Sequence, residues 1–296
     1  MSAPSDVVDV VSDPVDHLGI TQEQLAIVRE AIELQELRVD PRIRDHVLAP
    51  GDRGEGTLGG AVRMQSFTGP KLERLSTYRF QRAGILNEHL FHAWPGAGYD
   101  FPVLTTVVFE MVGDWIMLGV DMPPVVDVVF DREYYGRYYE GLTAALTEHW
   151  PRLSPHLRRP NPQPDAYFTN QLGSRLSVLV DLDGEAMPAA LDYVRAVTRA
   201  WVEAWASAEP VQDPAARAQI DLRRWTLMKK AYKGLDYHSP AGPSLASVLG
   251  WEGANLMFDH VFGPDEPEQP LTHQRRYLGV DVSPGTKARQ AQRGAS

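Results

Sequence analysis

The chain of 296 residues contains no cysteine. Without thiols the protein cannot form disulfides, use a cysteine nucleophile, bind zinc through sulfur or hold an iron–sulfur cluster of its own. If it transfers electrons, they therefore have to come from an external donor.

Long apolar runs and an excess of positive charge are also missing. No stretch of about 18 apolar residues occurs, so we expect no membrane span. We also expect no signal peptide, because the sequence shows no basic segment followed by an apolar one at its start. The chain has 29 Lys and Arg against 39 Asp and Glu, a formal net charge of −10, which argues against binding to nucleic-acid phosphates. We expect a cytoplasmic protein without a membrane or nucleic-acid partner.

A meander of strands lies between Arg79 and Pro124. Three apolar runs rich in Val, Leu, Phe and Trp are separated by turn residues at 95–98 and 113–114, which is typical of consecutive antiparallel strands. The pattern indicates that a sheet is the scaffold of the molecule.

Helical patterns precede and follow this meander. Apolar residues recur at helical spacing between Thr21 and Val39, behind a Thr21-x-x-Gln24 capping box. Apolar periodicity also predicts helices over 133–150, 187–206, 215–232 and 244–262, and strands over 62–67, 72–80 and 176–182. Together these elements predict an α/β (α+β) fold, a three-layer α/β/α sandwich around a central antiparallel sheet.

No long linker divides the chain. We expect a flexible arm at 1–18, one α/β/α domain over 19–264 and an extended tail over 265–296.

The segment 51–60 contains a G-x-G-x-x-G, but polar residues precede it and a strand pattern follows it. It therefore predicts a loop rather than a dinucleotide site.

Polar residues interrupt the first run of the meander. A side-chain period of two places Glu88, Leu90 and His92 on one face of a strand and His89 on the other. Because a carboxylate beside an imidazole raises the histidine pKa toward that of a general acid, Glu88 and His92 are candidate catalytic residues. The alternative interpretation is the solvated face of an edge strand.

The same segment does not predict a metal site. His89 and His92 point to opposite faces, so a shared ion is disfavoured. A haem held by one axial imidazole stays open as a less favoured alternative.

The order and spacing of several segments resemble the ferredoxin-dependent bilin reductases over roughly residues 60–264. The segments that carry the resemblance are 62–80, Trp94-Pro95, Tyr99–Pro102, Val120–Pro124, Ser174 with 178–180, Glu185–Met187, and Leu249–Ala254 leading to Val261-Phe262. The resemblance implies a linear tetrapyrrole between sheet and helices, no tightly bound cofactor, single electrons from ferredoxin and protons from side chains.

The positions that carry this chemistry in the family differ here. As the resemblance aligns them, the family's proton-relaying histidine falls on Leu90, its catalytic aspartate on Val107 and a further acidic residue on Tyr78. A late-loop aspartate falls on Ser239, and an arginine that would pair with a propionate falls on Asp181. A carboxylate in place of that cation repels a propionate, so a standard bilin is disfavoured as substrate.

We expect other polar groups to have taken over the lost roles. The predicted catalytic residues are His92, Glu88, Asp236 and His238. The predicted substrate-binding residues are Tyr78, Leu90, Thr105, Val107 and Ser239.

The resulting hypothesis is a ferredoxin-dependent oxidoreductase that acts on a conjugated pyrrole- or indole-like molecule in specialised-metabolite biosynthesis. Three alternatives stay open: a linear-tetrapyrrole (biliverdin) reductase with relocated acids, a haem-binding oxygenase and a non-catalytic ligand-binding protein. Basic residues are candidates for docking an acidic ferredoxin, namely Arg152, Arg158, Arg159, Arg223, Arg224, Lys229 and Lys230.

Overall fold

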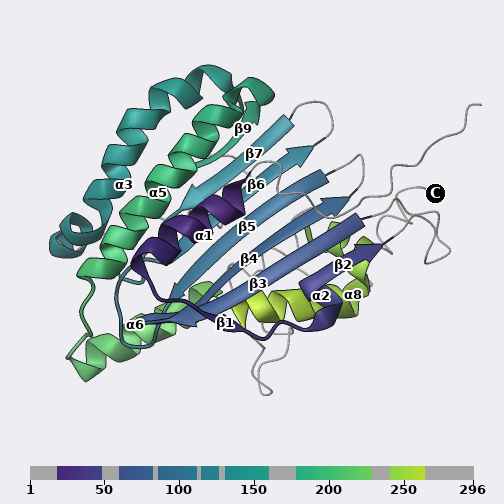
Figure 1. Ribbon diagram of the computed structural model, residues 1–296. Coiled ribbons are helices and arrows are strands. Elements are labelled where there is room, and N and C mark those ends of the chain that lie inside the picture. Colours follow the sequence, from purple (N-terminus) through teal and green to yellow (C-terminus); the bar gives the residue numbers. More distant parts are fainter. Residues whose placement is uncertain are drawn as a thin grey trace, which may run out of the picture.

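The computed structural model describes residues 19–48, 60–82, 86–111, 115–126, 131–159, 178–228 and 241–263. They form a nine-stranded sheet with helices on both faces (Figure 1). The strand order is β1-β3-β4-β5-β6-β7-β9-β8, β2 also pairs with β3, and all these pairings are antiparallel. The expected α/β/α sandwich is confirmed, whereas the arm at 1–18, the tail at 265–296 and nearly all of the glycine-rich loop lie outside the described residues.

The strands are β1 (Gln35–Leu37), β2 (Asp45–Leu48), β3 (Gly60–Gly69), β4 (Leu72–Arg82), β5 (Leu86–Pro95), β6 (Leu104–Met111), β7 (Trp115–Asp121), β8 (Leu157–Arg159) and β9 (Val178–Asp183). The α-helices are α1 (Ile20–Ala31), α2 (Pro41–Arg44), α3 (Arg132–Leu153), α5 (Met187–Ser207), α6 (Pro214–Thr226) and α8 (Ala241–Phe262), with short 3₁₀ turns η1 (Ser154–His156) and η3 (Gly184–Ala186). The predicted strands and the four later helices agree with these bounds to within a few residues where the structure describes them; residues 229–232 of the helix predicted over 215–232 lie outside the described residues.

The first helix is shorter than its apolar pattern predicts. It ends at Ala31, and residues 35–37 form β1, because they pair with the edge of β3. The predicted capping box is wrong as well: the helix begins at Ile20, and Gln24 lies inside it. The Gln24 side chain donates hydrogen bonds to the hydroxyls of Thr106 and Thr198, at 3.1 and 2.9 Å.

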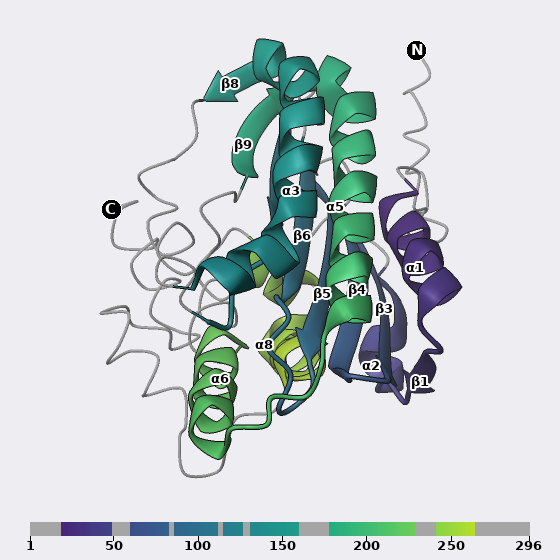
Figure 2. The same ribbon diagram turned by 90° about the vertical axis from the view of Figure 1, so that its left-hand side faces the viewer.

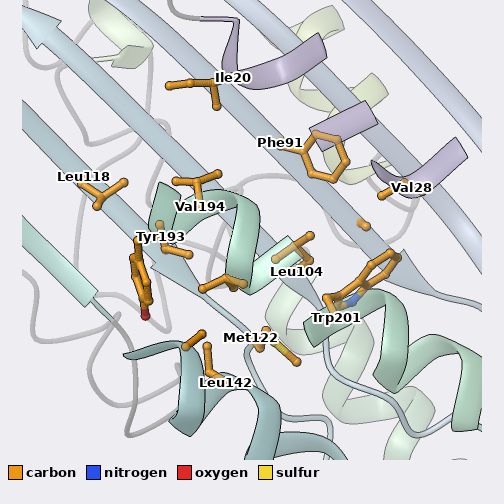
Figure 3. Packing of buried hydrophobic residues seen from close by; sticks show 14 of the residues in the cluster. Ile20, Val28, Phe91, Leu104, Leu118, Met122, Leu142, Tyr193, Val194 and Trp201 are labelled. Carbon is orange, nitrogen blue, oxygen red and sulfur yellow. The ribbon is translucent and has the colours of Figure 1, made fainter. Parts of the chain in front are cut away.

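The helices α1, α3 and α5 cover one side of the sheet, which we call the apolar face (Figure 1). Phe91, Leu104 and Leu118 of the sheet pack there against Val194 and Trp201 of α5, as Figure 3 shows. The Trp201 indole N–H donates to the carbonyl of Pro102 at 2.8 Å. Trp201 of α5 therefore covers this face of the sheet.

The opposite side, which we call the α8 face, is covered by α2 and α8, and Figure 2 shows α1 and α8 on opposite sides of the strands. Helix α8 is interrupted at Gly250, whose φ of 70° is a left-handed conformation that favours glycine. Arg74 of β4 donates hydrogen bonds to the carbonyls of Asp259 and His260, at 3.0 and 2.5 Å, and so fixes the end of α8 to the sheet.

Among the helices in the described ranges, none combines the length and the apolar character that a membrane crossing requires.

Candidate functional site

The side chains on the α8 face are arranged in rows that cross the strands, because residues in register share a face. The strand pairings define three rows, each about 7 Å from the next along the strands. We call them the glutamate row (Val62, Phe80, Glu88, Phe109, Met117 and Asp181), the tyrosine row (Met64, Tyr78, Leu90, Val107 and Gly119) and the histidine row (Ser66, Ser76, His92, Thr105 and Asp121).

Glu88 is a buried residue in the middle of the sheet. Its strand β5 has β4 on one side and β6 on the other, and Glu88 is 1% exposed, so the edge-strand interpretation is wrong. The phenol of Tyr78, itself fully buried, donates a hydrogen bond to Glu88 Oε1. This buried phenol–carboxyl pair holds a proton between two oxygen atoms, which is the arrangement that a proton donor or acceptor requires.

His92 is also buried, but its expected pairing with Glu88 is wrong. Four residues of strand separate the two side chains by about 13 Å, too far for a hydrogen bond. The imidazole instead stacks on Trp94, with ring centroids 5.8 Å apart, and meets the edge of Phe262 at 5.3 Å. Burial among these rings lowers the pKa of His92 to about 3, so the ring is neutral at neutral pH rather than a general acid of raised pKa.

The three positions that the resemblance aligns with the lost relay lie next to one another. Leu90 is in register with Tyr78 of β4 and with Val107 of β6. Leu90 is buried, and Val107 packs against the same apolar cluster. Of these three positions only Tyr78 carries a polar group.

Thr105 lies in the histidine row between His92 and Asp121, and it is 7% exposed. Asp121 is not among the predicted site residues, and Asp181 entered only as an aligned position. The structure buries both on this face, at 3% and 1% exposure. An acidic residue at an alternate position of an otherwise apolar strand is the signal that would have indicated them.

Three predicted residues, Asp236, His238 and Ser239, lie outside the described residues. His89 is buried on β5 and, by strand alternation, points to the apolar face, away from His92. The structure thus brings Tyr78, Glu88, Leu90, His92, Thr105 and Val107 onto one face.

The proposed docking residues have different surroundings. Arg224 is 8% exposed, donates to the Pro95 carbonyl at 3.0 Å and pairs with Glu73, so its assignment to an exposed basic patch is wrong. Arg223 is half-buried and donates to the carbonyl of Pro124 at 2.9 Å. Arg152 is exposed and forms an ion pair with Asp192 at 2.8 Å.

The chain was compared with known proteins. No protein-family model and no curated protein matches it. Among solved structures it is similar to phytochromobilin synthase from tomato, crystallised in complex with biliverdin, with a TM-score of 0.65 and 14% sequence identity; the match covers 88% of this chain and 84% of that chain. At this identity the similarity shows the fold alone: the protein has the α/β/α fold of a bilin reductase.

Proposed function

We propose that the protein is an oxidoreductase that transfers electrons and protons to a conjugated small molecule bound between the sheet and α8. The observation that carries this proposal is the buried hydrogen bond between Tyr78 and Glu88 on the α8 face. Burying a carboxyl group in a core costs several kcal/mol unless it is compensated, which favours a chemical role over a packing role. The tomato protein that shares this fold was crystallised with biliverdin, a conjugated molecule.

The electrons come from an external one-electron donor of the ferredoxin class. The sequence has no cysteine with which to hold an iron–sulfur cluster. A ferredoxin that docks through opposite charge loses affinity as ionic strength rises. Exposed Arg152 is a candidate contact, whereas Arg224 is not, because it is buried under its own partners.

The charges on the α8 face favour a substrate without carboxylates. Glu88, Asp121 and Asp181 are buried there, and strands β5, β6, β7 and β9 contain no Lys or Arg. Propionate groups would be repelled, whereas pyrrole or indole N–H groups can donate hydrogen bonds to carboxylates. A pyrrole- or indole-like molecule in specialised-metabolite biosynthesis is therefore the proposed substrate.

The position of the ligand site can be tested by measuring biliverdin binding to a double variant. Leu90→His together with Val107→Asp places on this face the residues that the bilin reductases carry at these positions. We expect the double variant to bind biliverdin with a red-shifted absorption band and to consume it when reduced ferredoxin is supplied, while the wild-type chain does not consume it. Asp181→Asn, which removes one repulsive charge, is expected to tighten biliverdin binding.

Other outcomes of this experiment change the proposal in defined ways. Consumption of biliverdin by the wild-type chain would favour a tetrapyrrole reductase with relocated acids. Absence of biliverdin binding by a folded double variant would contradict a ligand site between the sheet and α8.

A non-catalytic ligand-binding protein is the second candidate, and the apolar pairing of Leu90 with Val107 favours it. Such a protein keeps the fold but has lost the proton donors of its central row. Its expected signature is ligand binding without turnover in the presence of reduced ferredoxin. Ligand binding without turnover in both Tyr78→Phe and the wild-type chain would support this second candidate.

A further inference from the structure

Four tyrosines of α3 form a continuous line of touching rings, which we call the tyrosine chain. The ring centroids of Tyr134 and Tyr138 are 5.0 Å apart, and those of Tyr134 and Tyr139 are 6.0 Å apart. Tyr135 stacks on Tyr139 at 5.8 Å, with 13° between the ring planes. Tyr134, Tyr138 and Tyr139 are at most 2% exposed, whereas Tyr135 is 38% exposed. The tyrosine chain therefore leads from buried Tyr138 to the surface at Tyr135.

The buried end of the tyrosine chain contacts a carboxyl group. The Tyr138 phenol donates a hydrogen bond to Asp100 Oδ1 at 2.6 Å, and Asp100, which lies between β5 and β6, is 9% exposed. Arg137 donates to the other carboxyl oxygen of Asp100 at 3.2 Å, so the carboxylate is held in an ion pair. Packing α3 against the sheet requires the tyrosine rings but not a nearly buried carboxylate, which is costly to desolvate. The contact gives Tyr138 a base that one proton can reach directly.

The two other buried phenols of the tyrosine chain contact neutral peptide groups. Tyr139 donates to the carbonyl of Met122 at 2.5 Å, and the phenol oxygen of Tyr134 accepts the N–H of Val125 at 3.3 Å. A peptide group does not take up a proton near neutral pH, whereas a carboxylate does so readily. The base observed in contact with a buried phenol of this chain is therefore the one at Tyr138.

This difference decides where an oxidised state of the chain is most stable. A phenol that loses an electron becomes strongly acidic, so tyrosine is oxidised most easily where a base takes its proton in the same step. Burial and the neighbouring carboxylate raise the pKa of Tyr138, so its proton stays in place until an electron is removed. Electron exchange between aromatic rings is fast when the rings touch. Loss of an electron at Tyr135 should therefore be followed by transfer of an electron from Tyr138.

We propose that Tyr138 and Asp100 form a redox-active pair, which the tyrosine chain connects to the surface and which reduces one-electron oxidants of the peroxyl-radical class. The oxidant takes one electron from Tyr135 and becomes a peroxide anion, and Tyr135 regains an electron from Tyr138 along the chain. The Tyr138 O–H bond breaks, its proton goes to Asp100, and Tyr138 is left as a neutral radical. A small one-electron donor such as ascorbate then returns the electron, and Asp100 returns the proton. The tyrosine chain lies with α3 on the apolar face, so this activity does not depend on a ligand at the α8 face.

Four single variants separate the parts of this proposal. Tyr138→Phe keeps the ring but removes the phenol, and Asp100→Asn keeps the size of the side chain but cannot take up the proton. Tyr135→Phe removes the surface end of the tyrosine chain. Tyr193→Phe is the matched control, because Tyr193 of α5 is fully buried while no hydrogen-bond partner of its phenol is found among the described residues.

The first measurement locates the radical in the full chain. The protein is oxidised with flash-generated tris(bipyridine)ruthenium(III), frozen and examined by electron paramagnetic resonance, with ring-deuterated tyrosine to identify the tyrosyl signal. We expect Tyr138→Phe and Asp100→Asn to lose most of the wild-type signal, Tyr135→Phe to give a lower yield and Tyr193→Phe to keep the wild-type yield. A wild-type chain without a tyrosyl signal, or equal signals in wild type and folded Tyr138→Phe, would overturn the proposal. So would a loss in Tyr193→Phe as large as that in Tyr138→Phe.

The second measurement tests the connection to the surface. Ascorbate added after the flash is expected to remove the wild-type signal quickly and the remaining Tyr135→Phe signal more slowly, because the electron returns to Tyr138 through Tyr135. Equal decay rates in the two proteins would overturn this connection. Neither measurement uses biliverdin or ferredoxin, so a failure here is distinct from a failure of the proposed function.

Discussion

The two faces of the central sheet are built differently. The apolar face meets α1, α3 and α5 through large apolar side chains such as Phe91 and Leu118, and its buried Thr106 accepts a hydrogen bond from Gln24. The α8 face buries Glu88 and Asp181 in one row and a continuous line of polar groups in another. The apolar face also buries polar groups, among them Arg79 and His89, so the two faces differ in the buried carboxyl groups and the unbroken polar row of the α8 face.

The ends of the covering helices are fixed in similar ways on both faces. Lys71 donates to the carbonyls of Trp205 and Ala206 in the last turn of α5 and of Ala208 just past it, at 3.1, 3.2 and 2.7 Å. Arg74 does the same at the end of α8. Cations at helix C-termini also interact favourably with the helix dipole. The difference between the faces therefore lies in the sheet side chains rather than in how the helices are anchored.

The largest effect is expected on the apolar face. Phe91→Ala removes a fully buried ring and is expected to lower the free energy of unfolding by about 3 to 5 kcal/mol, as measured by urea denaturation. Thr105→Val on the neighbouring strand, which points to the other face, is the comparison and should cost far less. A loss of less than about 1 kcal/mol for Phe91→Ala would show that the packing of this face has been misjudged.

The next effect concerns the anchoring of α8. Arg74→Met keeps the apolar stem but loses the hydrogen bonds to the end of the helix, which should cost about 1.5 to 3 kcal/mol. Amide hydrogen exchange should become faster over residues 251–262. Lys71→Met is the matched variant and should affect the end of α5 instead. Equal exchange over α8 in the two variants would contradict separate anchoring of the two faces.

The buried imidazole makes stability depend on pH. Folded His92 stays neutral down to a pKa of about 3, whereas an unfolded histidine takes up a proton below about pH 6.5, so acid favours the unfolded chain between these values. At pH 5 this amounts to about 2 kcal/mol. The wild-type chain should therefore lose more stability than His92→Gln between pH 7 and pH 5. Parallel losses in the two proteins would show that His92 is protonated in the folded state.

A smaller effect is expected from the phenol–carboxyl pair. Tyr78→Phe removes the hydrogen bond to the buried carboxyl of Glu88 and should cost about 1 to 3 kcal/mol. Glu88→Gln keeps an acceptor for the Tyr78 phenol and removes a charge, so its cost should be smaller. Urea denaturation of both variants at pH 7 measures the difference. A reversed order would indicate that Glu88 is already protonated and is itself the donor.

Much of the fold was predictable because it depends on local periodicity. Alternating apolar residues predicted β3 and β4, and helical spacing predicted α3 and α5. The segment at residues 35–37 was not predicted, because its apolar spacing continues that of α1 while its conformation is set by pairing with β3. The same limit applies to Gln24, whose partners Thr106 and Thr198 come from distant elements.

The candidate site was predictable only in part. A period of two was enough to place Glu88, Leu90 and His92 on one face, and the structure confirms that placement. It was not enough to give their surroundings: proximity along the strand predicted a raised pKa for His92, whereas packing against Trp94 and Phe262 lowers it.

The sequence by itself determined the class of elements, the absence of thiol chemistry and the face on which each strand residue points, because these depend on composition and on backbone geometry over a few residues. Only the tertiary structure decided that Tyr78 contacts Glu88 and that five polar residues from five strands form one row. The physical reason is register: which residues meet across a sheet is set by the pairing of whole strands and by the helices that bury one face, and no single segment contains that information.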